Sequence, residues 1–158
     1  MRKKPDAGAA SAQDVQAAAV KLLARREHTQ AELRRKLAQR GYPPDLIEAA
    51  IAVLRQARLQ SDARFAEQFV SEKAAHGNGP VKIRAGLRER GLPDTEIEAA
   101  FAAVGTDWAA LAATAREKRF GPALPGDFEE RARQARFLQQ RGFAMEQIRA
   151  ALKGDVED

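Results

Sequence analysis

A segment of twelve residues recurs three times in this chain, and each copy carries a glycine near its end, at Gly41, Gly91 and Gly142. In every copy an arginine stands one position before the glycine, a leucine stands four positions before it, and an apolar residue stands directly after it. The three glycines are spaced about fifty residues apart, which is typical of an array of small modules. Modules of this size bury little surface alone, so we expect neighbouring modules to support one another.

The residues around each glycine predict helices. Ser11 with Asp14, Thr29 with Glu32, and Asp127 with Glu130 have the spacing of capping boxes, and Thr106 is a further candidate cap. A glycine can end a helix because it tolerates the left-handed backbone that closes the last turn. Apolar residues then occur six, nine and ten positions after each glycine, which is helical spacing. These positions hold Ile47, Ala50, Ile51, Ile97, Ala100, Phe101, Ile148, Ala151 and Leu152.

No stretch alternates apolar and polar residues with the period of a strand. The sequence therefore predicts an all-α protein made of three tandem three-helix repeats. We expect a disordered basic arm over 1–10, repeats over 11–59, 60–105 and 106–153, and an acidic tail over 154–158.

Composition limits the possible functions. The chain has no cysteine, which removes disulfides and thiolate chemistry and fits a reducing compartment. Neither a signal peptide nor a membrane-spanning run is expected, so the cytoplasm is the predicted location. The net charge of +5 favours an anionic partner, either nucleic acid or an acidic protein surface, although a basic protein without such a partner fits the same charge.

The titratable residues do not form a pattern typical of catalysis. His28 and His76 have no partner at ligand spacing, and both are expected to be solvated residues at helix ends. The segment Gly77–Lys82 lacks the residues of a phosphate-binding loop and predicts a turn. Most carboxylates have a basic residue three or four positions away, which is typical of helix stabilisation. We therefore expect no enzyme activity, no metal and no cofactor.

Basic residues on the exposed faces are the remaining candidates for a binding surface. Arg40, Arg90 and Arg141 are explained as cations at the negative ends of helices. The other cations and one glutamine are not required by the helices, and their pattern fits either a solvated face or a contact surface. The candidate partner-binding residues are Arg34, Arg35, Lys82, Arg84, Arg88, Arg133, Arg136 and Gln140.

Three groups of residues resemble the RecX family, the bacterial regulators of the recombinase RecA. They are Asp62–Glu67 with Val70, Gly79–Pro80 with Lys82, Ile83 and Leu87, and Arg136–Phe143 with Ile148. The resemblance extends from roughly Ala17 to Lys153. It implies an elongated, curved array of three-helix repeats, no cofactor and no catalytic residues.

The resemblance also implies a function. Members of the family bind the RecA filament on single-stranded DNA, lodge in its groove, and inhibit its ATPase, strand-exchange and co-protease activities, so that they regulate recombination, DNA repair and the SOS response. Two other readings stay open. The chain can be a helix-turn-helix-like nucleic-acid-binding module that acts without RecA, or a repeat scaffold for another acidic protein.

Overall fold

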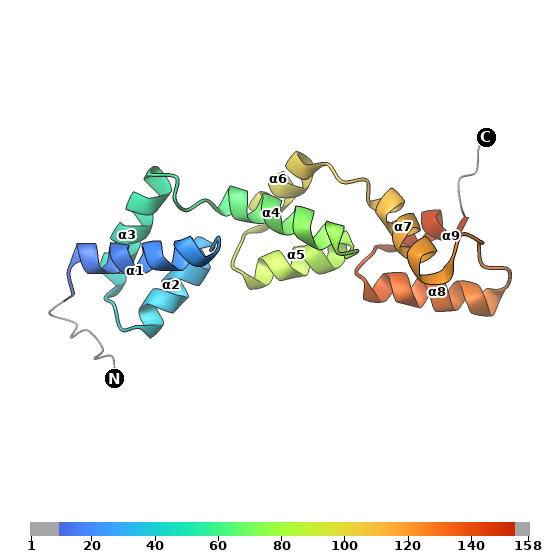
Figure 1. The fold of residues 1–158 in the computed structure, drawn as a ribbon, viewed down its shortest axis with the longest axis horizontal. Helices are drawn as coiled ribbons and strands as arrows, with labels where there is room; N and C mark the ends of the chain where they lie inside the picture. The colour runs from blue at the N-terminus through green and yellow to red at the C-terminus, as the bar shows by residue number, and fades with distance from the viewer. Residues whose placement is uncertain (1–9, 154–158) are drawn as a thin grey trace. The chain divides into compact units, whose positions relative to one another are not determined.

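The computed structural model describes residues 10–153, and these residues form nine α-helices and no strand (Figure 1). The predicted all-α fold of three successive three-helix repeats is confirmed. The predicted basic arm and acidic tail fall mainly on 1–9 and 154–158, which lie outside the described residues. The helices are α1 (Ala12–Arg25), α2 (Gln30–Gln39), α3 (Pro44–Gln56), α4 (Asp62–Ala75), α5 (Pro80–Glu89), α6 (Asp94–Val104), α7 (Trp108–Phe120), α8 (Phe128–Gln140) and α9 (Met145–Lys153).

The chain divides into two compact units that do not coincide with the three repeats. The first unit consists of Met1–Ala66 together with Arg88–Glu96, and the second consists of Glu67–Leu87 together with Ile97–Asp158. The middle repeat is therefore shared: the beginning of α4 and the end of α5 belong to the first unit, and most of α4, α5 and α6 belong to the second.

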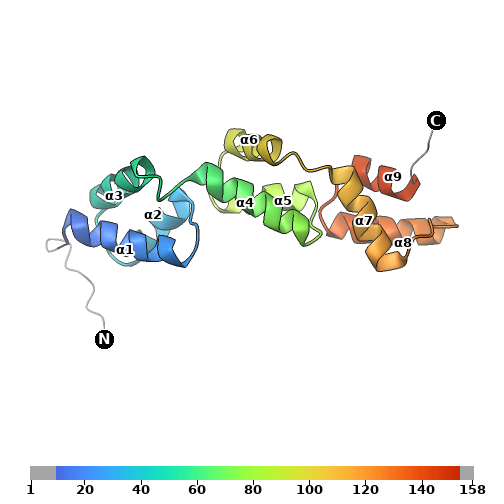
Figure 2. The same ribbon diagram turned by 45° about the horizontal axis from the view of Figure 1, so that its top comes forward.

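The core of the first unit lies between α1, α2 and α3, which gather together in both views (Figures 1 and 2). Leu33 and Leu37 are one turn apart on α2 and completely buried, and Ile47 and Ile51 face them from α3. Each such side chain contributes on the order of 1.5–3 kcal/mol when it leaves water. The full cluster contains Val15, Ala18, Ala19, Leu22, Leu33, Leu37, Ile47, Ala50, Ile51 and Leu54.

One core cluster of the second unit is built in the same way from α7, α8 and α9. Leu138 on α8 is completely buried, and Ile148, Ala151 and Leu152 approach it from α9. In all three repeats, the apolar residues six, nine and ten positions after the glycine are buried, as predicted. A tilted ring contact between Phe101 and Trp108, 5.4 Å between centroids, adds apolar packing between α6 and α7.

Three of the four predicted caps at helix starts are confirmed, and two of them form the predicted capping box. The capping boxes at Ser11 and Thr29 are both complete. The expectation that Thr106 caps α7 is wrong, because Asp107 accepts the bond from the Ala110 N–H instead. Asp127 caps α8 as predicted, but Glu130 does not return a bond to the cap, because its carboxylate is held by Arg133 and Gln134.

In the second unit, the C-terminal end of α8 meets the N-terminal end of α5. The Gly79 N–H donates to the Arg141 carbonyl at 2.7 Å, and the Val81 N–H donates to the Gly142 carbonyl at 2.9 Å. The first N–H groups and the last carbonyls of any helix lack partners within the helix. This joint therefore satisfies the free groups of two helix ends with each other.

A related joint occurs in the first unit, between the end of α5 and the start of α2. The Thr29 hydroxyl donates to the Arg90 carbonyl at 2.8 Å, while its oxygen accepts from the Glu32 N–H. A Cβ on Gly91 would collide with the Cβ of Ala31. The recurring glycine is thus required twice over at this position: for its left-handed backbone and for the close approach of another helix.

These joints predict different consequences of the same substitution at two glycines. Gly41 and Gly142 both have left-handed backbone, with φ of 86° and 95°, but a Cβ at Gly41 meets nothing, whereas one at Gly142 would overlap Lys82. Gly41→Ala is expected to lower the free energy of unfolding by about 1–2 kcal/mol from backbone strain alone. Gly142→Ala adds an overpacking cost of about 1–3 kcal/mol.

Urea unfolding of the two variants followed by circular dichroism measures this difference, with Gly41→Ala as the matched control. Equal losses of stability in the two variants would show that the close approach of α8 and α5 does not matter for stability.

Candidate interaction surface

The eight candidate binding residues all lie on the second helix of a repeat, on α2, α5 or α8. Arg34 and Arg35 are exposed on α2, Lys82 is exposed on α5, and Arg84 is half-buried there. The remaining four, all exposed, are Arg88, Arg133, Arg136 and Gln140. Because the helices of each repeat bury their apolar stripe, these polar side chains are left on the outer surface.

Four of the eight candidates form ion pairs within the protein. Arg34 pairs with Glu48 through two nitrogens, and Arg84 pairs with Glu98 in the same way at 2.7 and 3.2 Å. The Arg84 guanidinium also lies 4.3 Å from the centre of the Phe101 ring. These pairs join the second and third helices of the first two repeats, and such exposed pairs each contribute at most about 1 kcal/mol.

The other two paired candidates have partners closer in the sequence. Arg88 donates to Asp94 at 2.9 Å, and Arg133 donates to Glu130 at 3.1 and 3.2 Å. The Arg133 guanidinium also lies 5.0 Å from the centre of the Phe120 ring. A structural explanation therefore exists for all four arginines, in addition to any binding role.

The remaining four candidates are Arg35, Lys82, Arg136 and Gln140. All are exposed, and within the described part of the chain their side chains take part in no hydrogen bond or ion pair. Local structure does not use these groups, so they stay candidates for contact with a partner.

The third repeat departs from the charge pattern of the first two. Seven positions before the repeat glycine, the first two repeats have Arg34 and Arg84, but the third has Ala135. Seven positions after it, the first two repeats have Glu48 and Glu98, but the third has Arg149. The pairing is lost and an exposed cation replaces a carboxylate. Alignment of the repeats on their glycines carries this signal, which an inspection of separate helix faces does not detect.

A buried arginine organises the loop after α7. Arg116 is only 5% exposed, and its guanidinium donates to the carbonyls of Gly121 and Ala123 and to the Gln134 side chain. These acceptors are neutral, and the charge has no carboxylate among its bonding partners in the described residues. Arg116 thus holds the proline-containing loop 121–126 against α8, a role that sequence spacing alone does not indicate.

The expectation that His28 is solvated is wrong. It is 1% exposed, because the turn between α1 and α2 folds its ring inward. Its Nδ1 lies 2.9 Å from the Arg26 carbonyl and its Nε2 lies 2.9 Å from the Lys36 ammonium. A carbonyl only accepts and an ammonium only donates, so Nδ1 carries the proton and the ring is neutral. His76, in contrast, is exposed and bonds the Glu72 carbonyl at the end of α4, as predicted.

Burial lowers the pKa of His28, and the neighbouring Arg26 and Lys36 charges act in the same direction. Burial also acts on Glu32 and raises its pKa, but hydrogen bonds from Arg26 and the Thr29 N–H outweigh that effect, so that its pKa lies below the ordinary value. This cluster therefore holds a neutral histidine next to an ionised glutamate at the start of α2.

Residues 10–153 contain no group of three or more histidine, cysteine or acidic side chains placed to hold a metal ion. Among the same residues no helix is long and apolar enough to cross a membrane. These residues form repeated helices with charged outer faces, and such repeats commonly bind macromolecules.

Comparisons with known proteins match the chain to three successive domains. Three family models match in order: "RecX, first three-helix domain" over residues 17–54, the second three-helix domain over 61–100, and the third over 106–152. A regulatory protein RecX of Halorhodospira halophila is 46% identical over 153 residues, which covers 97% of this chain and 94% of the relative. One from Pseudomonas savastanoi is 47% identical and covers 89% of this chain and 90% of the relative.

Solved structures agree with the fold. The crystal structure of RecX from Lactobacillus salivarius superposes with a TM-score of 0.79 at 23% identity and covers 90% of this chain and 94% of its own. Three consecutive three-helix units define a helical-repeat protein. The chain belongs to the RecX family.

The environment of His28 predicts a specific pH dependence. A histidine in the unfolded chain takes up a proton near pH 6.5, whereas the folded protein resists protonation to lower pH. The unfolded state thus binds more protons below about pH 6.5, and stability falls as the pH drops through that value, by at most about 1.4 kcal/mol per pH unit. Above this range His28 contributes no pH dependence.

Chemical unfolding at about pH 7.5, 6.5 and 5.5 measures the slope of stability against pH across the ordinary histidine pKa. The variant His28→Gln should show a shallower slope than the unmodified protein, and His76→Gln serves as the control for loss of an exposed histidine. An unchanged slope in His28→Gln would contradict the neutral, buried state of this ring.

Proposed function

We propose that this protein binds the RecA filament assembled on single-stranded DNA, lodges in its groove, and inhibits RecA ATPase, strand exchange and co-protease activity. In this role it regulates recombination, DNA repair and the SOS response in the cytoplasm. The observation that supports the proposal most directly is the similarity to proteins named regulatory protein RecX, at 46% and 47% identity across nearly the whole chain.

The charge distribution is compatible with such a role. Basic side chains on the outer faces favour encounter with an anionic assembly and make binding sensitive to salt. Several weak contacts carried by one chain add through effective concentration, because the first contact brings the others close to their sites. Preferential binding to one filament state would shift the recombinase away from the state that hydrolyses ATP rapidly.

The proposed contact residues divide into two groups. Arg35, Lys82, Arg136 and Gln140 are free to meet a partner without breaking an internal bond. The paired arginines Arg34, Arg84, Arg88 and Arg133 can also contribute, because an exposed ion pair contributes little to stability and a guanidinium has five donor hydrogens. We therefore assign the first group the larger share of the binding free energy.

The proposal predicts that the purified protein lowers the ATP hydrolysis rate of RecA on single-stranded DNA in proportion to the amount added, until the filament is saturated. A coupled ATPase assay measures this, and a parallel titration of a labelled oligonucleotide without RecA measures direct DNA binding. Tight DNA binding with an unchanged ATPase rate would contradict the proposal and favour a nucleic-acid-binding module that acts without RecA.

Charge reversal tests whether Arg35 and Arg136 contact the partner. The double variant Arg35→Glu with Arg136→Glu should weaken inhibition about tenfold or more, because it replaces attraction by repulsion at two exposed positions that local structure does not need. The control variant Arg25→Glu with Arg55→Glu makes the same change in net charge at exposed residues of α1 and α3. Arg133 is left unchanged because its reversal would repel Glu130. Equal inhibition by the two double variants would exclude Arg35 and Arg136 as contact residues.

A further inference from the structure

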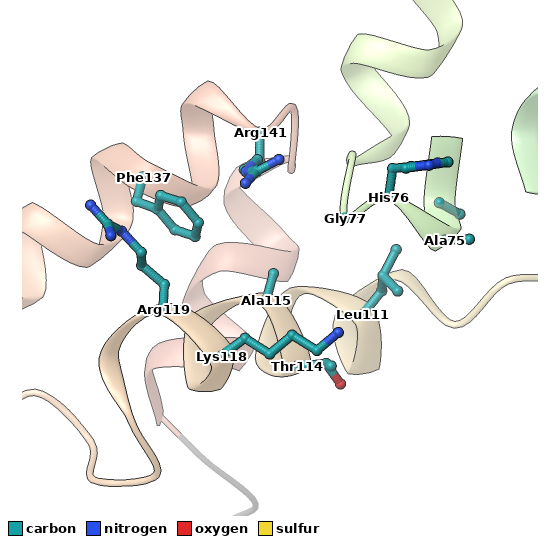
Figure 3. Close-up of a pocket in the computed structure, with 11 residues that line it drawn as sticks. Ala75, His76, Gly77, Leu111, Thr114, Ala115, Lys118, Arg119, Phe137 and Arg141 are labelled. Carbon is teal, nitrogen blue, oxygen red and sulfur yellow. The ribbon is translucent and has the colours of Figure 1, made fainter. Parts of the chain in front are cut away.

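A pocket of about 310 Å3 lies in the second unit, where the end of α4 approaches α7 and α8. Figure 3 shows the side chains that line it. Three of them are exposed cations, Lys118, Arg119 and Arg141, and Leu111 and Phe137 supply apolar surface. No lining residue is acidic. We propose that this pocket binds an acidic peptide segment of a protein partner.

Two of the cations lie over the same aromatic ring. The guanidinium of Arg141 lies 5.4 Å from the centre of the Phe137 ring, and that of Arg119 lies 5.9 Å from it. Phe137 itself packs against Phe120 in a T-shaped contact, with 5.3 Å between the ring centroids. A guanidinium that stacks on a ring keeps the N–H groups of its edge available for a carboxylate. The ring thus attracts two guanidinium groups without using their hydrogen bonds.

The pocket cations lack the internal counter-charges that other arginines have. Arg26, Arg64 and Arg84, for example, each contact a carboxylate at 2.6–2.9 Å. In the described residues no carboxylate pairs with Lys118, Arg119 or Arg141. A bound carboxylate would therefore meet three cations that no internal ion pair already uses.

The apolar part of the pocket favours a peptide over nucleic acid. A single strand binds by stacking its bases on free aromatic faces, but the Phe137 ring already has two guanidinium groups over it and a T-shaped contact with Phe120. Leu111 and Ala115 from α7 and Ala74 from α4 line the pocket beside the cations. An acidic segment that contains an aliphatic residue matches both properties, with carboxylates for the guanidinium groups and one side chain for this apolar wall.

Fluorescence polarisation with two labelled peptides tests the proposal. One probe has four glutamates around a central leucine, and the other has glutamines in place of the glutamates. The unmodified protein should bind the acidic probe, with weaker binding as salt is raised. The triple variant Lys118→Gln, Arg119→Gln and Arg141→Gln should bind it about tenfold or more weakly, because charge-assisted bonds are lost. Circular dichroism reports whether the variant retains its helices.

The control is the triple variant Lys21→Gln, Arg25→Gln and Arg55→Gln, which removes the same charge from exposed residues of the first unit. It should bind the acidic probe within about twofold of the unmodified protein, since these side chains lie outside the pocket. Equal weakening in both triple variants would overturn the proposal, because binding would then follow net charge alone. Equal binding of the glutamine probe would overturn it as well.

The conservative variant Arg119→Lys with Arg141→Lys keeps the charge but removes the planar donors. It should lose several-fold in affinity, and it gives a second test if the triple glutamine variant fails to fold. Affinity equal to that of the unmodified protein would contradict guanidinium recognition of carboxylates. If an unlabelled oligonucleotide bound this pocket more tightly than the acidic probe, the proposal would be overturned, and the ligand would be nucleic acid and not a peptide.

Discussion

The mutual satisfaction of free backbone groups at helix ends is the interaction on which the repeats depend. A helix that ended against another helix without such partners would bury unpaired N–H groups and carbonyls, at a cost of about 1–3 kcal/mol for each group. At the joint between α8 and α5, the Arg141 and Gly142 carbonyls meet the Gly79 and Val81 N–H groups, so that this cost is avoided. The absence of a side chain on the glycines allows the two backbones to come this close. At Gly91 and Gly142 the repeated glycine therefore links local helix termination to the assembly of each unit.

The third repeat differs from the first two in how its charged side chains are paired. In the first two repeats, Arg34 and Arg84 are paired with a glutamate of the following helix, which fixes their side chains against the protein. In the third repeat the equivalent glutamate is replaced by Arg149, and the cations around Phe137 have no acidic neighbour among their contacts in the described residues. Repeats with one backbone design thus differ in the electrostatic surface that they offer to partners.

The sequence predicted the helices, their periodic core and most of their caps, because these depend on residues within one or two turns of each other. The same local reasoning failed for His28, whose burial depends on the turn that brings Arg26 and Lys36 around its ring. It also missed the pocket, because Ala74, Lys118 and Arg141 lie far apart in the sequence and become neighbours only through packing. Which arginines are paired could be predicted only in part, since Arg34 and Glu48 come from different helices.

The boundaries of the sequence repeats do not coincide with the boundaries of the compact units in the structure. Each repeat runs over three helices, yet the middle repeat contributes its start and the turn between α5 and α6 to one unit and the rest of its length to the other. A cooperative folding unit is defined by contacts and not by sequence repetition. The boundaries between repeats are consequently poor places to divide this protein into fragments: a fragment of the first repeat alone would lack the Arg90 and Gly91 backbone that α2 contacts. The smallest piece that folds independently is expected to be longer than one repeat.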